Sequence, residues 1–129
     1  MEIPDAPKRT LSDFYEEVGG DIMNVLERLE DIDTVEMFVL GFPSDPSYSM
    51  LLKRLQVSDL KSAFRAAHTL KGISYTLGFQ SLGDCAAKLC DKLREGLLPP
   101  ATVLQQLKTE YKRVLSAIEK LKTTKFYFN

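Results

Sequence analysis

Apolar residues recur three and four positions apart along almost the whole chain, and this spacing is the feature that most constrains the fold. A period of 3.6 residues gathers apolar side chains on one stripe of an α-helix, whereas a half-buried strand needs strict alternation. Strand-like alternation is nearly absent from the 129 residues, and no repeat of solenoid length occurs. We therefore predict an all-α protein.

Glycine and proline divide the apolar pattern into separate helices, because glycine commonly ends a helix and proline is suited to a first turn. The predicted helices span residues 11–18, 21–29, 34–41, 46–55, 58–77, 80–95 and 101–121. We expect the fourth of them to bury Met50, Leu51, Leu52 and Leu55. Beyond the last helix, Phe126, Tyr127 and Phe128 could dock on the other helices. Short loops between long amphipathic helices favour antiparallel neighbours, so we predict an up-and-down bundle.

Composition excludes several classes of protein. The net charge of -1 and the pI of about 5.8 argue against a general nucleic-acid binder, whose footprint would be strongly basic. No apolar stretch approaches the roughly 18 residues of a membrane span. Residues 1–10 contain acidic residues and prolines but no apolar core, unlike a secretory signal. We expect a cytoplasmic protein that binds neither nucleic acid nor membrane.

Charge is unevenly distributed along the chain. Residues 1–36 hold eleven acidic and three basic residues, whereas residues 37–129 hold seven acidic and fourteen basic ones. One interpretation is that the two parts are solvated helix faces that attract each other within one fold. The other is that the basic part offers a surface to an acidic partner or to a phosphate.

Two cysteines, Cys85 and Cys90, are too few for a disulfide framework. Five residues apart on one helix, they would lie about 140° apart around its axis and could not easily bond to each other. We expect two buried or half-buried free thiols.

The only histidine, His68, lies in the middle of the predicted 58–77 helix. The apolar stripe of that helix comprises Leu60, Ala63, Ala67, Leu70, Ser74 and Leu77. At 100° per residue, His68 points roughly 130° away from the centre of this stripe. It should therefore face solvent or lie at a rim.

The helical neighbours of His68 favour a functional role over an inert surface residue. Phe64, Arg65, Lys71, Gly72 and Tyr75 are placed beside it by their spacing. A glycine inside a helix costs roughly 1 kcal/mol against alanine, and nothing local requires a break there. Its simplest use is to clear space beside the imidazole, and the Lys71 charge can meet an anion there. These features point to a nucleophilic or anion-binding histidine.

The segment His68-Thr69-Leu70-Lys71-Gly72 resembles the signature of the histidine-containing phosphotransfer (HPt) domain of two-component signalling. Further elements of the resemblance are Ala67, Leu77-Gly78-Phe79, Leu82 and Leu89. The residues around the motif resemble those of small bacterial stand-alone HPt proteins more than those of plant or yeast HPt proteins. The resemblance implies an antiparallel four-helix bundle with additional short N-terminal helices. It also implies a single domain, 1–129, with a bundle core at about 34–121 and an N-terminal helical extension at 1–30.

The resemblance implies that His68 accepts a phosphoryl group from a response-regulator receiver domain or a hybrid histidine kinase. It would then pass the group to another receiver aspartate. Lys71 and Gly72 would support the phosphate. The expected docking residues are Phe64, Arg65, Ala67 and Tyr75. Magnesium would reside on the receiver, so we expect no cofactor in this chain, and we expect a monomer.

The sequence also bears on alternative functions. It holds no glycine-rich nucleotide loop, so we expect a phosphocarrier and not an enzyme with its own ATP site. A metal site in a helical bundle needs several inward His or Glu residues, and only one histidine is present, so we expect no metal. Cys90 occupies the place where many members of the family have Gln or Glu. The remaining alternative is a degenerate HPt adaptor that binds receivers without carrying phosphate.

Overall fold

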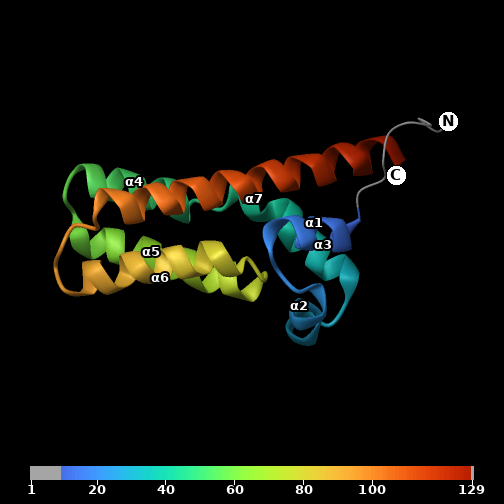
Figure 1. The fold of residues 1–129 in the computed structure, drawn as a ribbon, viewed down its shortest axis with the longest axis horizontal. Helices are drawn as coiled ribbons and strands as arrows, with labels where there is room; N and C mark the ends of the chain where they lie inside the picture. The colour runs from blue at the N-terminus through green and yellow to red at the C-terminus, as the bar shows by residue number, and fades with distance from the viewer. Residues whose placement is uncertain (1–9, 129) are drawn as a thin grey trace.

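The computed structural model describes the backbone of residues 10–128 and the side chains of residues 10–123 (Figure 1). The helices are α1 Leu11–Val18, α2 Ile22–Leu29, α3 Ile32–Gly41, the 3₁₀ turn η1 Phe42–Ser44, α4 Ser47–Gln56, α5 Leu60–Thr76, α6 Gln80–Arg94 and α7 Ala101–Phe128. No strand occurs among these residues, which confirms the all-α prediction. The predicted contacts of Phe126, Tyr127 and Phe128 lie outside the described side chains.

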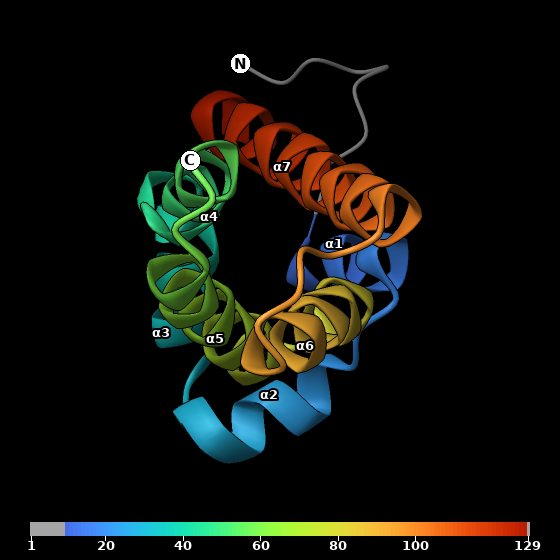
Figure 2. The ribbon, with the colours of Figure 1, turned by 90° about the vertical axis from the view of Figure 1, so that its left-hand side faces the viewer.

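Four helices, α4 to α7, lie side by side and form an antiparallel bundle, seen from the side in Figure 1 and along its axis in Figure 2. Short connections join α4 to α5 and α5 to α6, so each helix reverses the direction of the one before it. Within the bundle, α5 packs between α4 and α6. The three N-terminal helices α1, α2 and α3 gather at one end (Figure 1). In the described part of the chain, no helix combines the length and the apolar character needed to span a membrane.

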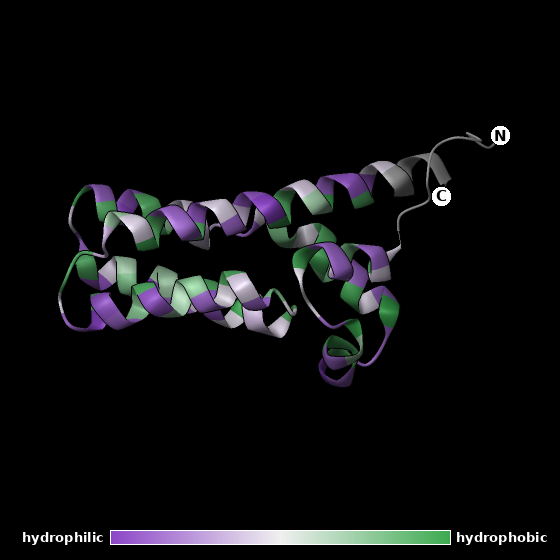
Figure 3. Ribbon diagram, in the orientation of Figure 1, coloured by the Kyte–Doolittle hydropathy of each residue, from purple (hydrophilic) through white to green (hydrophobic). Residues whose placement is uncertain are grey.

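The predicted apolar stripes form the bundle core. Each helix carries both apolar and polar residues (Figure 3). On α5, Leu60 is half-buried and the rest of its predicted stripe is buried. The prediction that Met50 of α4 is buried is wrong, because this residue is 41% exposed. The buried face of α4 is centred on Leu51, Leu55 and Tyr48, and Met50 lies about 130° from that centre.

Helix α1 contributes directly to the core. Phe14 and Tyr15 are buried, and their rings meet the ring of Phe79 at the start of α6, with 5.8 Å between the Phe14 and Phe79 centroids. The Tyr15 hydroxyl donates a hydrogen bond of 2.7 Å to the carbonyl oxygen of Leu77. Burial raises the pKa of this hydroxyl, so it remains a donor at neutral pH. The N-terminal helices are thus packed into the bundle at the end of α5.

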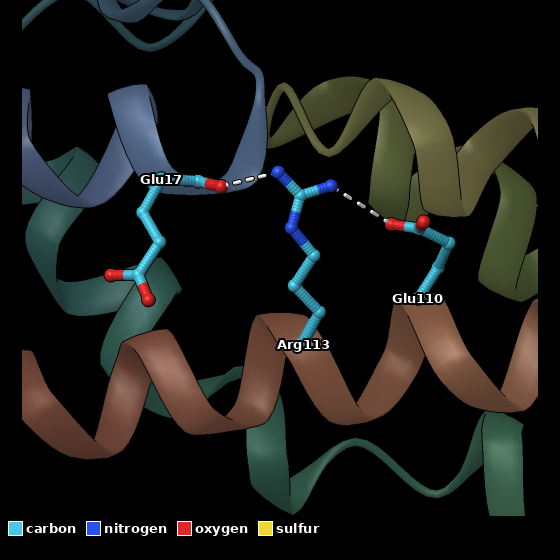
Figure 4. A network of polar contacts seen from close by, with 3 residues as sticks. All are labelled: Glu17, Glu110 and Arg113. Carbon is cyan, nitrogen blue, oxygen red and sulfur yellow. Dashed lines mark hydrogen bonds and ion pairs between the residues drawn. The ribbon is translucent and has the colours of Figure 1, made fainter.

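A hydrogen bond and an ion pair hold α1 against α7, and Figure 4 shows the hydrogen bond. Arg113 of α7 donates to the backbone carbonyl oxygen of Glu17 at 2.6 Å and to the Glu110 carboxylate at 3.4 Å. Lys120 forms an ion pair of 2.7 Å with the Glu17 carboxylate. The Lys120–Glu17 ion pair joins the acidic N-terminal part to the basic remainder, which supports the interpretation that the two parts attract each other within one fold.

Helix α2 is attached to the carboxyl end of α5 by Arg28. Its guanidinium donates to the carbonyl oxygens of Tyr75, at 2.9 Å, and Thr76, at 3.0 Å. The last carbonyls of a helix have no partners within the helix, so Arg28 satisfies groups that would otherwise need water. The backbone between α1 and α2 also lies close to the backbone that follows α5, since a Cβ added at Gly20 would collide with the carbonyl oxygen of Gly78.

Replacing Arg28 with methionine should lower the free energy of unfolding by about 1 kcal/mol, the usual net value of such hydrogen bonds at an exposed position. Methionine keeps a long apolar side chain but cannot donate to the α5 carbonyls. The measurement is urea unfolding followed by circular dichroism. Arg54→Met is the matched control, because the Arg54 side chain is exposed on α4 and forms no hydrogen bond within the described residues. Equal midpoints for the two variants would contradict the role of Arg28.

Candidate functional site

His68 lies on the exposed ridge of α5. The helix begins after Asp59, whose carboxylate accepts a hydrogen bond of 3.2 Å from the Ser62 amide, and hydrogen bonding to Ser62 lowers the Asp59 pKa. The helix ends before Gly78, which has a φ of 78°, a conformation that favours glycine. The side chain of His68 is exposed while Leu70 is buried, so the predicted helical phase is confirmed.

An aromatic ring and a second helix flank the imidazole. The centroid of the Phe64 ring lies 5.9 Å from that of His68. The guanidinium carbon of Arg94, on α6, lies 5.5 Å from the Phe64 centroid, a cation–π arrangement. Arg94 also pairs with Asp91 at 3.2 Å. No local pattern in the sequence indicates Arg94, because only the packing of α6 on α5 brings it to this side of His68.

Lys71 is half-buried on the α6 side of α5 and forms no hydrogen bond or ion pair within the described residues. It lies close to Cys90, whose thiol pKa is raised by burial and partly lowered again by the Lys71 charge. The protonated thiol gives Lys71 no anionic partner, so this cation remains available to an incoming anion. Both Cys85 and Cys90 are buried free thiols, as predicted.

Gly72 faces open space. A Cβ added there would meet no heavy atom within 4 Å outside its own helical surroundings. Packing within the chain therefore does not require a glycine at this position. By contrast, Gly83 of α6 is required by packing, because a Cβ there would lie 2.5 Å from the ring of Tyr75.

A groove of about 480 Å³ runs beside His68, between α5 and the helices α2 and α3. Its lining is mostly apolar and comprises Leu29, Phe38, His68, Thr69, Gly72, Ile73, Thr76 and Leu77. Phe38, on α3, is 48% exposed. Phe38 reaches this groove only through the packing of α3 against α5, which no local pattern in the sequence indicates.

A model of the Hpt domain family matches residues 10–117, most of the chain and nearly all of the described bundle. The chain belongs to the Hpt domain family. No curated protein and no solved structure matches it. Hpt domains are phosphocarriers of two-component signalling that interact with receiver domains and kinases, and they lack an ATP site of their own. The match begins at α1, in agreement with the place of Phe14 and Tyr15 in the core.

The structure separates the predicted docking residues of this Hpt domain. Phe64 and the exposed Arg65 lie beside His68, on different flanks of α5. Tyr75 packs against α6, where its hydroxyl donates to Asp84 at 2.6 Å. Burial, and then this hydrogen bond, raise the pKa of Tyr75 to about 12. The prediction that Ala67 is a docking residue is wrong, because Ala67 lies on the core stripe of α5 and has no exposed surface.

Proposed function

We propose that this Hpt domain is a histidine phosphocarrier in which His68 receives a phosphoryl group from a receiver phospho-aspartate and passes it to another receiver aspartate. The observation that carries the proposal is Gly72. Its missing side chain leaves open space one helical turn from His68, although the packing of the chain does not need that space. The open space serves an approaching partner.

The transfer balances as an in-line displacement. An unprotonated nitrogen of the neutral imidazole attacks phosphorus, a P–N bond forms, and the P–O bond to the aspartate breaks with its electron pair leaving on the carboxylate. The reverse exchange at the second receiver restores the imidazole. Such transition states are loose, so positioning and charge neutralisation supply most of the catalysis. Lys71 offers the charge neutralisation from this chain, and the exposure of His68 permits the approach.

The partner supplies the remaining requirements of the transfer. The receiver, or a hybrid histidine kinase, brings the magnesium ion and most catalytic groups. This chain contributes the nucleophile, a cation and a docking surface, and acts as a cytoplasmic monomer. Support for this division is that the chain has a single histidine and belongs to a family of phosphocarriers without an ATP site of their own.

Incubation with a receiver domain phosphorylated by radioactive acetyl phosphate tests the proposal. The chain should acquire a label that is labile in acid and stable in alkali, the behaviour of phosphohistidine. Lys71→Ala should slow labelling about tenfold, because a cation beside the developing charge is lost. The control is Lys88→Ala, since Lys88 is exposed and lies beside a different groove, between α6 and α7. Binding of the receiver without any labelling would instead establish the adaptor function.

A further inference from the structure

The hairpin formed by α2 and α3, residues 21–42, is unusually apolar on its exposed surface. The described residues include eight strongly exposed large apolar side chains, and half of them belong to this hairpin. They are Met23, Ile32, Met37 and Phe38. Phe38 also lines the groove that contains His68. The hairpin therefore carries an exposed apolar surface, and Phe38 brings part of it beside the proposed phosphorylation site.

The same hairpin is strongly acidic. It holds six carboxylates and a single cation, Arg28, which is bound to the carbonyl oxygens at the end of α5. Asp21 and Asp31 cap helices. Glu27, Glu30 and Asp33 are exposed and form no ion pair within the part of the chain that the structure describes. These three charges are therefore free to act on a partner.

The opposite side of His68 is basic. Lys71 lies on the α6 side of α5, near Cys90, and Arg94 of α6 lies over the Phe64 ring. Gly72 and Thr69, on the other flank of the ridge, face the groove and the α2–α3 hairpin. His68 thus stands between Lys71 and Arg94, the latter paired with Asp91, and the acidic, apolar hairpin of α2 and α3, while the exposed Arg65 lies on the same flank of α5 as Thr69.

We propose that the α2–α3 hairpin selects among receiver domains, favouring those that carry basic side chains around an apolar contact next to the phospho-aspartate. This inference rests on the proposed function, because it names the partner chemistry of the same site. The anionic phospho-aspartate is attracted to the basic side of His68. A receiver that places Lys or Arg against the hairpin completes the charge match, whereas one with Asp or Glu there is repelled.

The physical basis is that complementary charges at an interface steer encounter and suppress wrong partners, and that the effect weakens with salt. The apolar surface has a different role. Burial of Phe38 and its neighbours adds affinity that depends little on salt. Selection by charge and affinity by apolar contact can therefore be separated by experiment.

The test uses one receiver domain with basic side chains beside its aspartate and a variant of that receiver in which these are replaced by glutamate. The hairpin variant of this chain is Glu27→Gln, Glu30→Gln and Asp33→Asn. The matched control is Glu16→Gln, Glu95→Gln and Glu119→Gln, because these carboxylates are exposed elsewhere. At low salt, transfer from the basic receiver to the hairpin variant should be about 5- to 10-fold slower than to the parent. Transfer from the glutamate receiver should become faster, and both differences should vanish at about 0.5 M salt.

Phe38→Ser tests the apolar contact, with Val57→Ser as its control, since Val57 is exposed in the turn between α4 and α5. The Phe38 variant should slow transfer from the basic receiver about tenfold at both salt concentrations, and the Val57 variant should not. Urea unfolding of both variants shows whether the fold is retained. If Phe38→Ser unfolds, Met37→Ser, at a side chain 62% exposed, takes its place.

The outcomes separate the two proposals. If the parent is labelled and the hairpin variant distinguishes the two receivers as the parent does, the selection by the hairpin is wrong and the phosphocarrier function stands. If no receiver labels the parent, the proposed function is wrong. The selection of receivers by the hairpin is then tested by measuring how tightly the two unphosphorylated receivers bind the parent and the hairpin variant. If the dissociation constants for the parent and the hairpin variant are equal, the proposed selection is wrong.

Discussion

Replacing His68 with glutamine is expected to abolish labelling by a phosphorylated receiver while leaving the fold unchanged. Glutamine has a similar size, but its amide nitrogen is not a nucleophile, so no P–N bond can form. The side chain is exposed at the edge of the groove and its ring lies beside Phe64, so the free energy of unfolding should change by less than about 0.5 kcal/mol. Transfer should fall below detection, a loss of at least about 10³-fold.

The chain offers a clean design for this experiment, because His68 is its only histidine. An acid-labile label on the parent therefore has no second imidazole to reside on. Circular dichroism and urea unfolding show that the variant is folded, and titration with the unphosphorylated receiver shows that docking persists. Undiminished labelling of His68→Gln would refute the site.

The parts of the site that lie on one helix could be predicted from the sequence. Helical spacing fixes the angle between His68 and the buried Leu70, so the exposure of the imidazole follows from local geometry alone. The same rule placed Lys71 and Gly72 beside it. The cap at Asp59 and the glycine at position 78 defined the ends of this helix because each acts on its immediate neighbours.

The parts that depend on packing between distant helices could not be predicted. Arg94 and Phe38 reach the site from α6 and α3, and Arg28 reaches the end of α5 across 47 residues. No periodicity encodes such pairings, since each follows from how whole helices dock. The docking role of Ala67 conflicted with its place on the core stripe, and the structure resolves the conflict in favour of burial, because Ala67 has no exposed surface.

Gly72 provides the second large expected effect, in which stability and activity move in opposite directions. Gly72→Ala should raise the free energy of unfolding by up to about 1 kcal/mol, because alanine is the better helix former and its Cβ meets no atom within 4 Å. Gly72→Leu should also fold, since the position is exposed at the edge of the groove. Both should slow phosphotransfer, by about tenfold for alanine and about 100-fold for leucine, because in-line approach requires close positioning of the two proteins.

Gly83→Ala is the matched comparison for this result. Its Cβ would collide with the Tyr75 ring, so this substitution should lower stability without a specific effect on the transfer step. Urea unfolding gives the stability of each variant, and the initial rate of labelling gives its phosphotransfer activity. Both are measured on the same samples. Transfer to Gly72→Leu at the parent rate would mean that the glycine does not serve access. Unfolding of Gly72→Leu would mean that the phase of α5 is wrong, and the exposure of His68, on which the proposed function depends, would fail with it.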